Sequence, residues 1–373
     1  MSEKQTIAIL CGGQSPEHVI SILSAQNVSK ALDPTQYTSV VIYLSQQGAW
    51  YQVDPSKKNY ELQKDRKLVL VPGQPKKPFA LASDPTQSIA IDCVIPMLHG
   101  ANGEDGTMQG LLDLLGVPYV GAGVIGSAIC MQKLIAKRLL RFAGLPTSDW
   151  VCIEAGNVDE YSYEVLANEL GQTFFVKPSA LGSSIGISKV RNANEYKRAI
   201  RDALQYDDQV IVERAIKGRE IECSVLGNDK PVASLPGELI TSHDFYSYDA
   251  KYHDPSLKIE TPADIPEAAV KIIQELAVKA FETLQCRGMA RVDFFLTEGQ
   301  EAIINEVNTI PGFTDVSMYP KNWEASGLTY SDLLEDLIQL AQARHHHRSG
   351  LSHFYLAHSD QVDTSSSLGK TLE

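Results

Sequence analysis

Apolar and polar residues alternate along the first third of the chain in a way that predicts strands and helices in turn. An apolar strand at residues 6–11 leads into an amphipathic helix, and a second strand follows at residues 39–44. This βαβ opening is typical of a parallel α/β domain. A third buried strand at residues 89–97 runs into a glycine-rich loop and a helix at residues 107–115. Residues 45–90 have mixed polarity and predict peripheral strands and loops.

The rest of the chain is richer in strand-forming runs. Strands are predicted within residues 173–190, 209–216, 221–226, 235–240 and 291–308, and helices over residues 159–170, 266–286 and 331–344. The polar and aromatic stretch from about residue 241 to residue 258 has no period. It predicts a long loop, of the kind that forms lids.

Two runs rich in Val, Phe and Ile within residues 291–308 flank a turn, which predicts a β-hairpin. If the turn lies at the centre of this segment, Arg291 lies opposite Asn308 and Asp293 lies opposite Glu306. Because side chains on a strand alternate, these four point to one face. On the other face, the core residues are expected to be Val292, Phe294, Leu296, Ile303 and Val307.

The polar face of this hairpin is a candidate metal site. Two carboxylates directly across a ladder repel each other, so Asp293 against Glu306 favours a bound cation. The amide of Asn308 lies beside them, and oxygen-only ligands suit Mg²⁺ that is shared with substrate phosphates. The alternative is the solvated polar face of an ordinary hairpin.

Composition and charge narrow the functional classes. The chain has 373 residues, of which 43% are hydrophobic and 21% charged, as expected for a globular protein of two or three domains. The net charge of −13 argues against a nucleic-acid-binding protein, and an anionic nucleotide would need locally placed Lys and Arg. No apolar run approaches the length of a membrane span, and the first residues lack a signal-peptide pattern. Scattered cysteines without a Cys-x-x-Cys pair indicate reduced thiols of a cytoplasmic protein.

A glycine-rich loop with Gly182, Ser183, Ser184 and Gly186 follows the strand that ends at Lys177. Backbone N–H groups of such a loop can bind phosphate oxygens, and Lys177 can add a positive charge. The Gly-x-x-x-x-Gly-Lys-Ser pattern of a Walker A loop is absent from the sequence. An ordinary hairpin loop is the alternative.

Two further polar residues follow strands, at the sheet edge where parallel α/β folds bind ligands. Ser15, Pro16 and Glu17 have the form of the N-cap and first two positions of a helix. Glu17 can bind a ligand there, or simply stabilise the helix by roughly 0.3–1 kcal/mol. His99 follows the strand at residues 89–97, although a lone His is more often structural than catalytic.

Gly121, Gly123 and Gly126 match the dinucleotide-binding fingerprint G-x-G-x-x-G. The preceding strand is barely present, and the candidate acid, Asp149, precedes a strand instead of ending one. The match is therefore a weak basis for an NAD-dependent dehydrogenase. The helix after these glycines, expected to end near residue 144, carries Lys133 and Lys137 one turn apart on one face.

Taken together, the motifs occur in an order that resembles the D-alanine–D-alanine ligase family of the ATP-grasp superfamily, over roughly residues 5–343. The matching segments are residues 15–21, 98–110, 131–133, 176–186, 250–252, 291–293 and 305–312. One departure is Gln132, where the family often has Asp before the lysine. Another is the chain after residue 344, which exceeds the usual end of the family.

The resemblance implies an α/β and α+β architecture. An N-terminal Rossmann-like parallel-sheet domain at residues 1–121 is followed by a two-lobed ATP-grasp. Its lobes are expected at residues 122–208 and 209–344, with a lid loop at about residues 241–258. The polar tail, residues 345–373, is expected to be disordered.

The resemblance also implies a role for each matching residue. Those that bind ATP are Lys133, Lys177 and Ser184 at the phosphates, Glu213, Arg214 and Ile216 at the adenine, and Glu220 at the ribose. The ligands of two Mg²⁺ or Mn²⁺ ions are Asp293, Glu306 and Asn308. The residues at the first D-alanine are Glu17, Ser183 and Tyr252, with His99 beside them. Those at the carboxylate of the second D-alanine are Lys251 and Ser317. Arg291 and the N–H of Gly312 stabilise the oxyanion.

The implied reaction joins two D-alanines through an acyl phosphate, at the expense of ATP, to supply a peptidoglycan precursor. The implied partners are these small molecules and a second copy of the chain in a cytoplasmic homodimer, with neither nucleic acid nor membrane. A D-alanine–D-lactate ligase of the same fold is the nearest alternative, and the residues Ala250, Lys251 and Tyr252 favour the dipeptide enzyme over it. A nucleotide-binding protein without turnover is another. The presence of four residues that serve the substrates and not ATP argues against it: Glu17, Lys251, Arg291 and Ser317.

Overall fold

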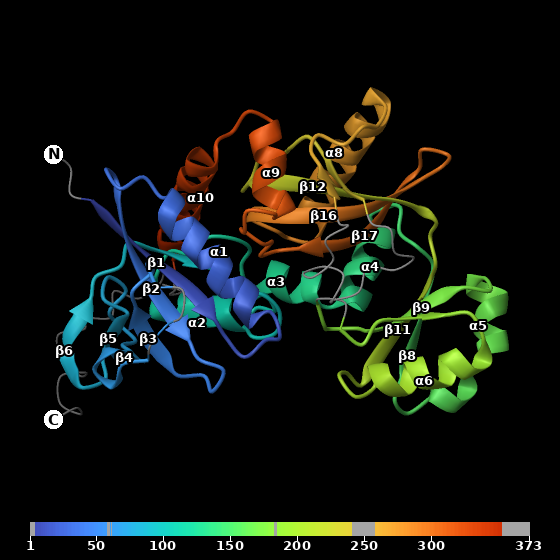
Figure 1. Ribbon diagram of the computed structural model, residues 1–373, viewed down its shortest axis with the longest axis horizontal. Helices are drawn as coiled ribbons and strands as arrows, with labels where there is room; N and C mark the ends of the chain where they lie inside the picture. Colours follow the sequence, from blue (N-terminus) through green and yellow to red (C-terminus); the bar gives the residue numbers. More distant parts are fainter. Residues whose placement is uncertain (1–3, 58–59, 61, 183–184, 241–257, 353–373) are drawn as a thin grey trace, which may run out of the picture.

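Three β-sheets organise the part of the chain that the computed structural model describes, residues 4–57, 60, 62–182, 185–240 and 258–352. In Figure 1 the N-terminal sheet lies at the left, a small lobe with β8, β9 and β11 at the lower right, and a larger lobe with β12, β16 and β17 at the upper right.

The N-terminal sheet has a parallel centre and an antiparallel extension, in the order β6-β5-β4-β3-β2-β1-β7. β1 (Gln5–Gly12) pairs in parallel with β2 (Tyr37–Leu44) and with β7 (Cys93–Pro96). The antiparallel strands are β3 (Trp50–Val53), β4 (Lys67–Leu70), β5 (Phe79–Leu81) and β6 (Asp84–Ile89), with a short 3-10 helix, η1 (Lys64–Arg66), before β4. The predicted α/β opening and peripheral strands are confirmed. The third parallel strand is shorter than predicted, because residues up to Ile89 belong to β6.

Helices cover both faces of this sheet. On one face, α1 (His18–Ala31) and the last helix, α10 (Tyr330–Ser349), bury residues such as Ile7 and Ile9 of β1. On the other face, α2 (Thr107–Leu115) closes a second core. The core beneath α1 and α10 continues into the larger lobe through Phe313 and Tyr319. One hydrophobic core therefore joins the N-terminal sheet to the larger lobe.

The start of α1 differs from the prediction. The helix begins at His18, and Glu17 occupies the N-cap position instead of the first helical turn. Ser15 precedes the helix, and its hydroxyl accepts a hydrogen bond of 3.0 Å from the backbone N–H of Glu17. Ser15 and Pro16 therefore form a turn before the helix, and the Glu17 carboxylate stays at the carboxyl end of β1.

The small lobe is an antiparallel sheet with its own core, in the order β10-β9-β11-β8. Its strands are β8 (Trp150–Glu154), β9 (Phe174–Pro178), β10 (Ser188–Val190) and β11 (Gln209–Arg214). Its helices are η2 (Val158–Glu160), α5 (Tyr163–Leu170) and α6 (Ala193–Ala203). The side chain of Asn192 caps α6 by accepting from the N–H groups of Asn194 and Glu195.

The larger lobe is built on the path β15-β14-β12-β16-β17, with β13 beside β12. Its strands are β12 (Gly218–Gly227), β13 (Val232–Ala233), β14 (Gly237–Ile240), β15 (Lys258–Glu260), β16 (Gly288–Thr297) and β17 (Ala302–Asn308). Its helices are α8 (Glu267–Thr283) and α9 (Met318–Ala325). Leu140 of α4 (Lys133–Phe142) also packs into the core of this lobe.

The hairpin of β16 and β17 has the predicted pairing at the end that carries the candidate site residues. Arg291 pairs with Asn308 and Asp293 pairs with Glu306. The pairing then shifts by one residue, because a bulge follows Asp293 and Phe294 faces Ile304. Ile304 is consequently buried in the core, whereas the predicted core residue Ile303 is half-buried on the other face.

The apparent dinucleotide fingerprint belongs to a junction between elements. Tyr119 forms only an isolated bridge with Val94, so in the described chain no regular strand leads directly into the glycines. The predicted single helix after them breaks at Gln132 into α3 (Val124–Met131) and α4. Asp149, the candidate acid, forms ion pairs with Arg141 at 3.1 Å and with Arg214 at 3.2 Å. These contacts leave the motif without its dinucleotide-binding context.

The last helix, α10, continues past its predicted end at residue 344 and runs to Ser349. Arg344 donates hydrogen bonds to the carbonyl oxygens of Gly121 and Tyr119, the latter at 2.8 Å, and its guanidinium stacks 4.6 Å from the Tyr119 ring. Arg348 forms an ion pair of 3.2 Å with Asp113. Residues 345–349 are therefore helical, which corrects the predicted start of the tail, and residues 353–373 lie outside the described part. None of the described helices has the length and apolar character needed to cross a membrane.

Candidate active site

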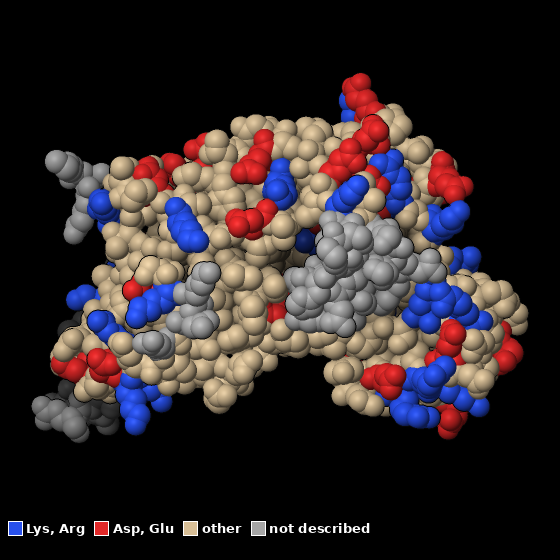
Figure 2. All heavy atoms as spheres, viewed as in Figure 1, with Lys and Arg blue, Asp and Glu red and all other residues tan. Residues whose placement is uncertain are grey.

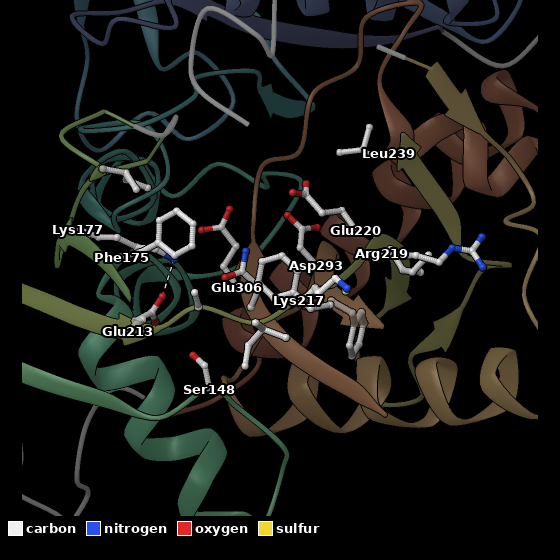
Figure 3. A pocket seen from close by; sticks show the side chains of 18 of the residues that line it. Ser148, Phe175, Lys177, Glu213, Lys217, Arg219, Glu220, Leu239, Asp293 and Glu306 are labelled. Carbon is white, nitrogen blue, oxygen red and sulfur yellow. Dashed lines mark ion pairs between the residues drawn. The ribbon is translucent and has the colours of Figure 1, made fainter. Parts of the chain in front are cut away.

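A cleft of about 740 Å³ lies between the small lobe and the larger lobe. In Figure 3, Phe175, Lys177 and Glu213 lie on one side of it, and Glu220, Asp293 and Glu306 lie on the other. The candidate site residues that line it are Lys133, Lys177, Glu213, Arg214, Ile216, Glu220, Arg291, Asp293 and Glu306. Residues from four separate sequence motifs therefore share one cavity.

Three buried charges form the base of the small-lobe wall. One carboxylate oxygen of Glu213 lies 2.8 Å from Nζ of Lys137, and the other lies 2.5 Å from Nζ of Lys177. Burial alone would raise the pKa of Glu213, but the two lysines outweigh it and lower the pKa to about 2. Burial disfavours the charge of Lys177, yet Glu213 outweighs this effect and raises the pKa of Lys177. Glu213 and Lys177 are therefore held in their charged forms at neutral pH. Burial lowers the pKa of Lys137, and the carboxylate of Glu213 opposes that change.

Lys133 lies at the start of α4 and reaches toward the glycine-rich loop. Its Nζ donates to the carbonyl of Leu181 at 2.5 Å, and its backbone N–H donates to the carbonyl of Ser179 at 2.9 Å. Burial lowers the pKa of Lys133, and the nearby carboxylate of Glu306 opposes that change. The lysine thus faces both the loop and the carboxylates of the opposite wall.

The segment that connects the lobes supplies the predicted adenine and ribose side of the cleft. Arg214 directs its guanidinium outward, to Asp149 and to the carbonyl of Glu169 at 3.1 Å. A ligand in the cleft can therefore contact the backbone of Arg214 more readily than its side chain. Ile216 follows it, and Glu220 lies on β12 opposite Phe295.

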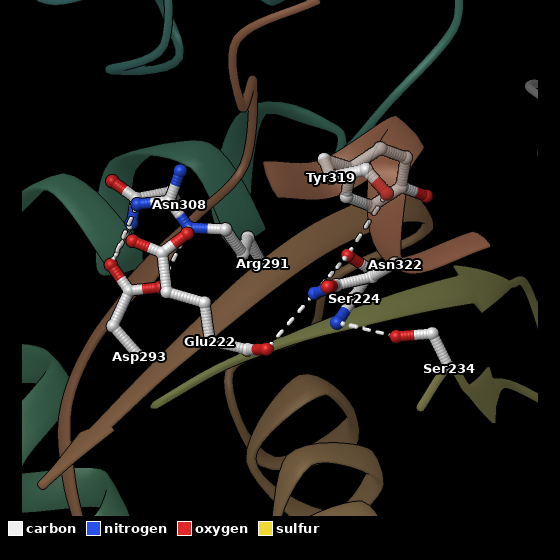
Figure 4. A network of polar contacts seen from close by, with 8 residues as sticks. All are labelled: Glu222, Ser224, Ser234, Arg291, Asp293, Asn308, Tyr319 and Asn322. Carbon is white, nitrogen blue, oxygen red and sulfur yellow. Dashed lines mark hydrogen bonds and ion pairs between the residues drawn. The ribbon is translucent and has the colours of Figure 1, made fainter. Parts of the chain in front are cut away.

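The wall on the larger lobe is centred on Arg291 (Figure 4). Its Nε and Nη2 each donate at 2.7 Å to the carboxylate of Asp293, and Nε also lies 2.8 Å from Glu222. Asn308 donates from its amide nitrogen to the same Asp293 carboxylate at 2.9 Å. Burial disfavours the charge of Arg291, but Asp293 and Glu222 outweigh it and raise the pKa of Arg291. The guanidinium is therefore a permanent cation in a fixed position.

The donor set of this wall fits a hard cation. Asp293, Glu306 and Asn308 present carboxylate and amide oxygens from adjacent positions of the β16–β17 ladder. Within the described residues, no three His, Cys, Asp or Glu side chains converge closely enough to hold a metal by themselves. A metal at this wall would thus need further oxygens, as when Mg²⁺ shares its ligands with substrate phosphates.

A second group of predicted residues lies beside the N-terminal sheet and does not line the main cleft. A carboxylate oxygen of Glu17 is 3.2 Å from the space that a Cβ on Gly100 would fill, which places it next to His99. The hydroxyl of Ser317 is 2.7 Å from the position that a Cβ on Gly312 would take. A side chain at either glycine would therefore displace a group of the candidate site.

A chain of hydrogen bonds connects these two places. Nδ1 of His99 lies 2.9 Å from the carbonyl of Ile310, and its Nε2 lies 3.3 Å from the hydroxyl of Ser24. The backbone N–H of Phe313 donates to the same hydroxyl at 3.2 Å. With the His99 proton on Nδ1, the imidazole and Ser24 fix the loop on either side of Gly312. His99 therefore has a structural contact on both ring nitrogens.

Four predicted site residues lie outside the described part of the chain. They are Ser183, Ser184, Lys251 and Tyr252. The predicted lid falls almost wholly outside it as well, since only Lys258 of that segment belongs to a described strand, β15.

The structure adds two residues for which the sequence analysis predicts no role. Lys137 reaches Glu213, and its spacing of one turn from Lys133 was the available signal. Glu222 reaches Arg291 from β12, where it pairs with Asp293. Its position two residues after Glu220 places it on the same strand face, and that alternation was the signal for it.

Comparisons with known proteins decide the family. The model for the D-ala D-ala ligase N-terminus matches residues 6–122, and the model for the D-ala D-ala ligase C-terminus matches residues 139–339. The chain belongs to the D-alanine–D-alanine ligase family. A D-alanine–D-alanine ligase of Coxiella burnetii (strain Dugway 5J108-111) is 45% identical over 95% of this chain and 98% of that protein.

Solved structures agree with this family and with its ATP-grasp fold. The D-alanine-D-alanine ligase from Coxiella burnetii has a TM-score of 0.83 and 42% identity, covering 93% of this chain and 97% of the other. The VanG D-Ala:D-Ser ligase from Enterococcus faecalis has a TM-score of 0.80 and 36% identity, covering 91% of this chain and 100% of the other. The family and fold predictions from the sequence are confirmed, and the chain is an enzyme of the ligase class.

Proposed function

We propose that this chain joins two D-alanine molecules to D-alanyl-D-alanine and converts ATP to ADP and phosphate. The observation that carries the proposal is the shared cleft, in which Lys133, Lys177 and Glu213 face Arg291, Asp293 and Glu306. The first group suits a nucleotide with its phosphates, and the second suits a reacting carboxyl group. The product would serve peptidoglycan precursor synthesis, the known role of this family.

In the proposed first step, the carboxylate of one D-alanine attacks the γ-phosphorus of ATP. The bond to the β–γ bridging oxygen breaks, so that ADP leaves and a D-alanyl phosphate forms. Negative charge spreads over the transferring phosphoryl oxygens, which is why lysines are effective catalysts. Lys133 and Lys177 supply this charge from the small-lobe side, and Ser184 belongs to the loop proposed to cover the phosphates.

In the proposed second step, the amine of another D-alanine attacks the acyl carbon, and phosphate leaves. The developing oxyanion is stabilised by Arg291 and by the backbone N–H of Gly312. Glu222 has an indirect role, because it holds the Arg291 guanidinium in place at 2.8 Å. Glu17, Ser183, Tyr252 and His99 are proposed at the first D-alanine, and Lys251 and Ser317 at the carboxylate of the second.

Asp293, Glu306 and Asn308 are proposed to hold two Mg²⁺ ions, or Mn²⁺, together with the nucleotide phosphates. Bound metal would neutralise charge on the phosphates during transfer. Asp293 already shares its oxygens with Arg291 and Asn308. These two side chains would therefore set how the carboxylate is presented.

The decisive experiment measures phosphate release from ATP with D-alanine, L-alanine, D-lactate or D-serine as the second substrate, and identifies the product by mass. The proposal expects D-alanyl-D-alanine, and little product from the other three. A depsipeptide as the main product would establish the D-lactate alternative, and binding of ATP without turnover would establish a non-catalytic protein. Lys177→Met should abolish turnover. Lys217→Met is the matched control, because Lys217 lines the same cleft but is 91% exposed and pairs with Glu298 at the surface.

The enzyme is further proposed to be a cytoplasmic homodimer without nucleic-acid or membrane partners. On the face shown in Figure 2, the described Lys and Arg side chains intermingle with Asp and Glu. This pattern and the net charge of −13 support a small-molecule enzyme rather than a nucleic-acid-binding protein. Sedimentation of the purified protein tests the dimer.

A further inference from the structure

We propose that Lys137 is the fixed counter-ion of Glu213, which allows Lys177 to leave Glu213 and bind the nucleotide phosphates. Lys137 would thus control nucleotide affinity as a positioning residue, without touching the nucleotide. The inference rests on the function proposed above, in which Lys177 binds phosphates and Glu213 faces adenine.

Glu213 uses each of its carboxylate oxygens for a different lysine. Oε1 lies 2.8 Å from Nζ of Lys137, and Oε2 lies 2.5 Å from Nζ of Lys177. The Glu213 side chain is only 4% exposed. Two cations therefore share one buried carboxylate, and the cluster carries one net positive charge that suits an approaching anion.

The two lysines are not equivalent in position. Lys177 lines the cleft, and its side chain is 12% exposed. The Lys137 side chain is 3% exposed and lies behind the carboxylate on α4. Its Nζ also contacts the hydroxyl of Ser148 at 2.9 Å and lies 5.8 Å from the centre of the Trp150 ring. Lys177 can thus turn toward the cleft, whereas Lys137 is enclosed by Glu213, Ser148 and Trp150.

Nucleotide binding requires an exchange at one oxygen of Glu213. If Lys177 moves to the phosphates, Oε2 of Glu213 becomes free to accept a hydrogen bond from the adenine amino group. The carboxylate is then still paired at Oε1. Without Lys137, the same movement would leave a buried carboxylate with no cation, which is strongly unfavourable. Lys177 would then remain on Glu213 and would be lost to the phosphates.

Lys137→Met tests the exchange, because methionine fills a similar space without the charge. Titration calorimetry with ADP should show an affinity lower by roughly tenfold or more, a size typical of coupling within a charged network. In turnover, KM for ATP should rise more than kcat falls. Arg138→Met is the matched control, because it removes a positive charge from the next, exposed position of α4 and should leave ADP affinity unchanged.

A double-substitution cycle separates this role from a purely structural one. In the Glu213→Gln background no carboxylate needs a counter-ion, so adding Lys137→Met should change ADP affinity by less than about twofold. It should also raise the melting temperature, because Glu213→Gln alone leaves Lys137 buried beside a neutral partner. If Lys137→Met weakens ADP binding equally in both backgrounds, the inference is overturned. If Lys137→Met alone fails to fold, the double variant decides. Folding with the ADP affinity of Glu213→Gln supports the inference, and failure of the double variant to fold overturns it.

The outcomes distinguish this inference from the proposed function. A wild-type enzyme that neither binds ADP nor turns over D-alanine contradicts the proposed function itself. A wild-type enzyme that binds ADP, together with a Lys137→Met variant that binds it equally well, contradicts only the counter-ion role.

Discussion

Asp293 lies directly opposite Glu306 in the β16–β17 ladder, and the pair is not simply repulsive. Arg291 contacts Asp293 through two hydrogen bonds of 2.7 Å. Glu306 in turn favours the charged forms of Lys133, Lys177 and Arg291. The sequence pattern predicts a cation beside these two carboxylates. The chain's own Arg and Lys side chains supply part of that positive charge.

Glu306→Gln should therefore lower stability even without metal. The substitution removes a negative charge that compensates the buried Arg291 and the partly buried Lys133 and Lys177, at a cost on the order of 1 kcal/mol. Turnover should fall at least about a hundredfold, because charge on the transferring phosphoryl group is no longer neutralised. The melting temperature in EDTA and Mg²⁺-dependent turnover measure the two effects. Glu301→Gln, an exposed change at the start of the same hairpin arm, is the control. A rise in melting temperature would show that repulsion from Asp293 dominates after all.

Glu222→Gln should separate the positioning of Arg291 from the binding of ATP. It weakens the contact that holds Arg291 from β12, so kcat should fall roughly ten- to a hundredfold while KM for ATP stays nearly constant. Glu238→Gln is the matched control, because Glu238 is also buried and binds Arg219 at 2.7 Å in the same sheet. Equal losses of kcat in both variants would mean that any buried pair in this sheet matters, and that Arg291 has no special dependence on Glu222.

Acid unfolding should report on Glu213. Its pKa is lowered to about 2 from an ordinary value of 4.5. A carboxyl group whose pKa is lower in the folded state adds stability above its ordinary pKa and loses it as the pH falls. Between about pH 4.5 and pH 2, wild type should therefore lose on the order of 1–3 kcal/mol that Glu213→Gln does not lose. Urea unfolding across this range measures the difference, and parallel curves for the two proteins would contradict it.

Arg344 and Arg348 lie one turn apart on α10 and should differ in importance. Arg344→Met leaves two carbonyl oxygens, of Tyr119 and Gly121, without their donor, at a cost of about 1–3 kcal/mol. Arg348→Met removes only an ion pair whose arginine is 55% exposed, and exposed pairs contribute about 0–1 kcal/mol. Thermal unfolding of both variants tests this order. Similar melting temperatures would show that the Arg344 contacts carry no net stability.

Strand periodicity predicts the hairpin part of the candidate site, whereas the roles of the other candidate residues are predicted from the resemblance to the family. The pairing of Asp293 with Glu306 follows from alternation and a central turn, and the structure has this pairing. The same argument failed for Ile303, because a bulge adds one residue to β17 and reverses which side chains face the core beyond it. A bulge depends on how the whole sheet packs, and it cannot be predicted from the pattern of apolar and polar residues along one strand.

Contacts between residues far apart in the sequence were the other feature that the sequence could not predict. The pairing of Lys137 with Glu213 joins α4 to β11, and Glu222 meets Arg291 across two strands. Each residue taken alone reads as an ordinary charged side chain. The extension of α10 to Ser349 was missed for a similar reason, since Arg344 and Arg348 gain their partners only from the N-terminal domain.

The core shared between the two ends of the chain has a consequence for how the protein is made. Ile7 and Ile9 of β1 lie in the same core as Leu334 and Ile338 of α10. While the chain is being synthesised, this face of the first strand therefore lacks part of its cover until residues near Ala341 have left the ribosome. The small lobe, which has a separate core, can form earlier. This face of the N-terminal sheet is thus covered only after α10 has been made, although its strands are synthesised first.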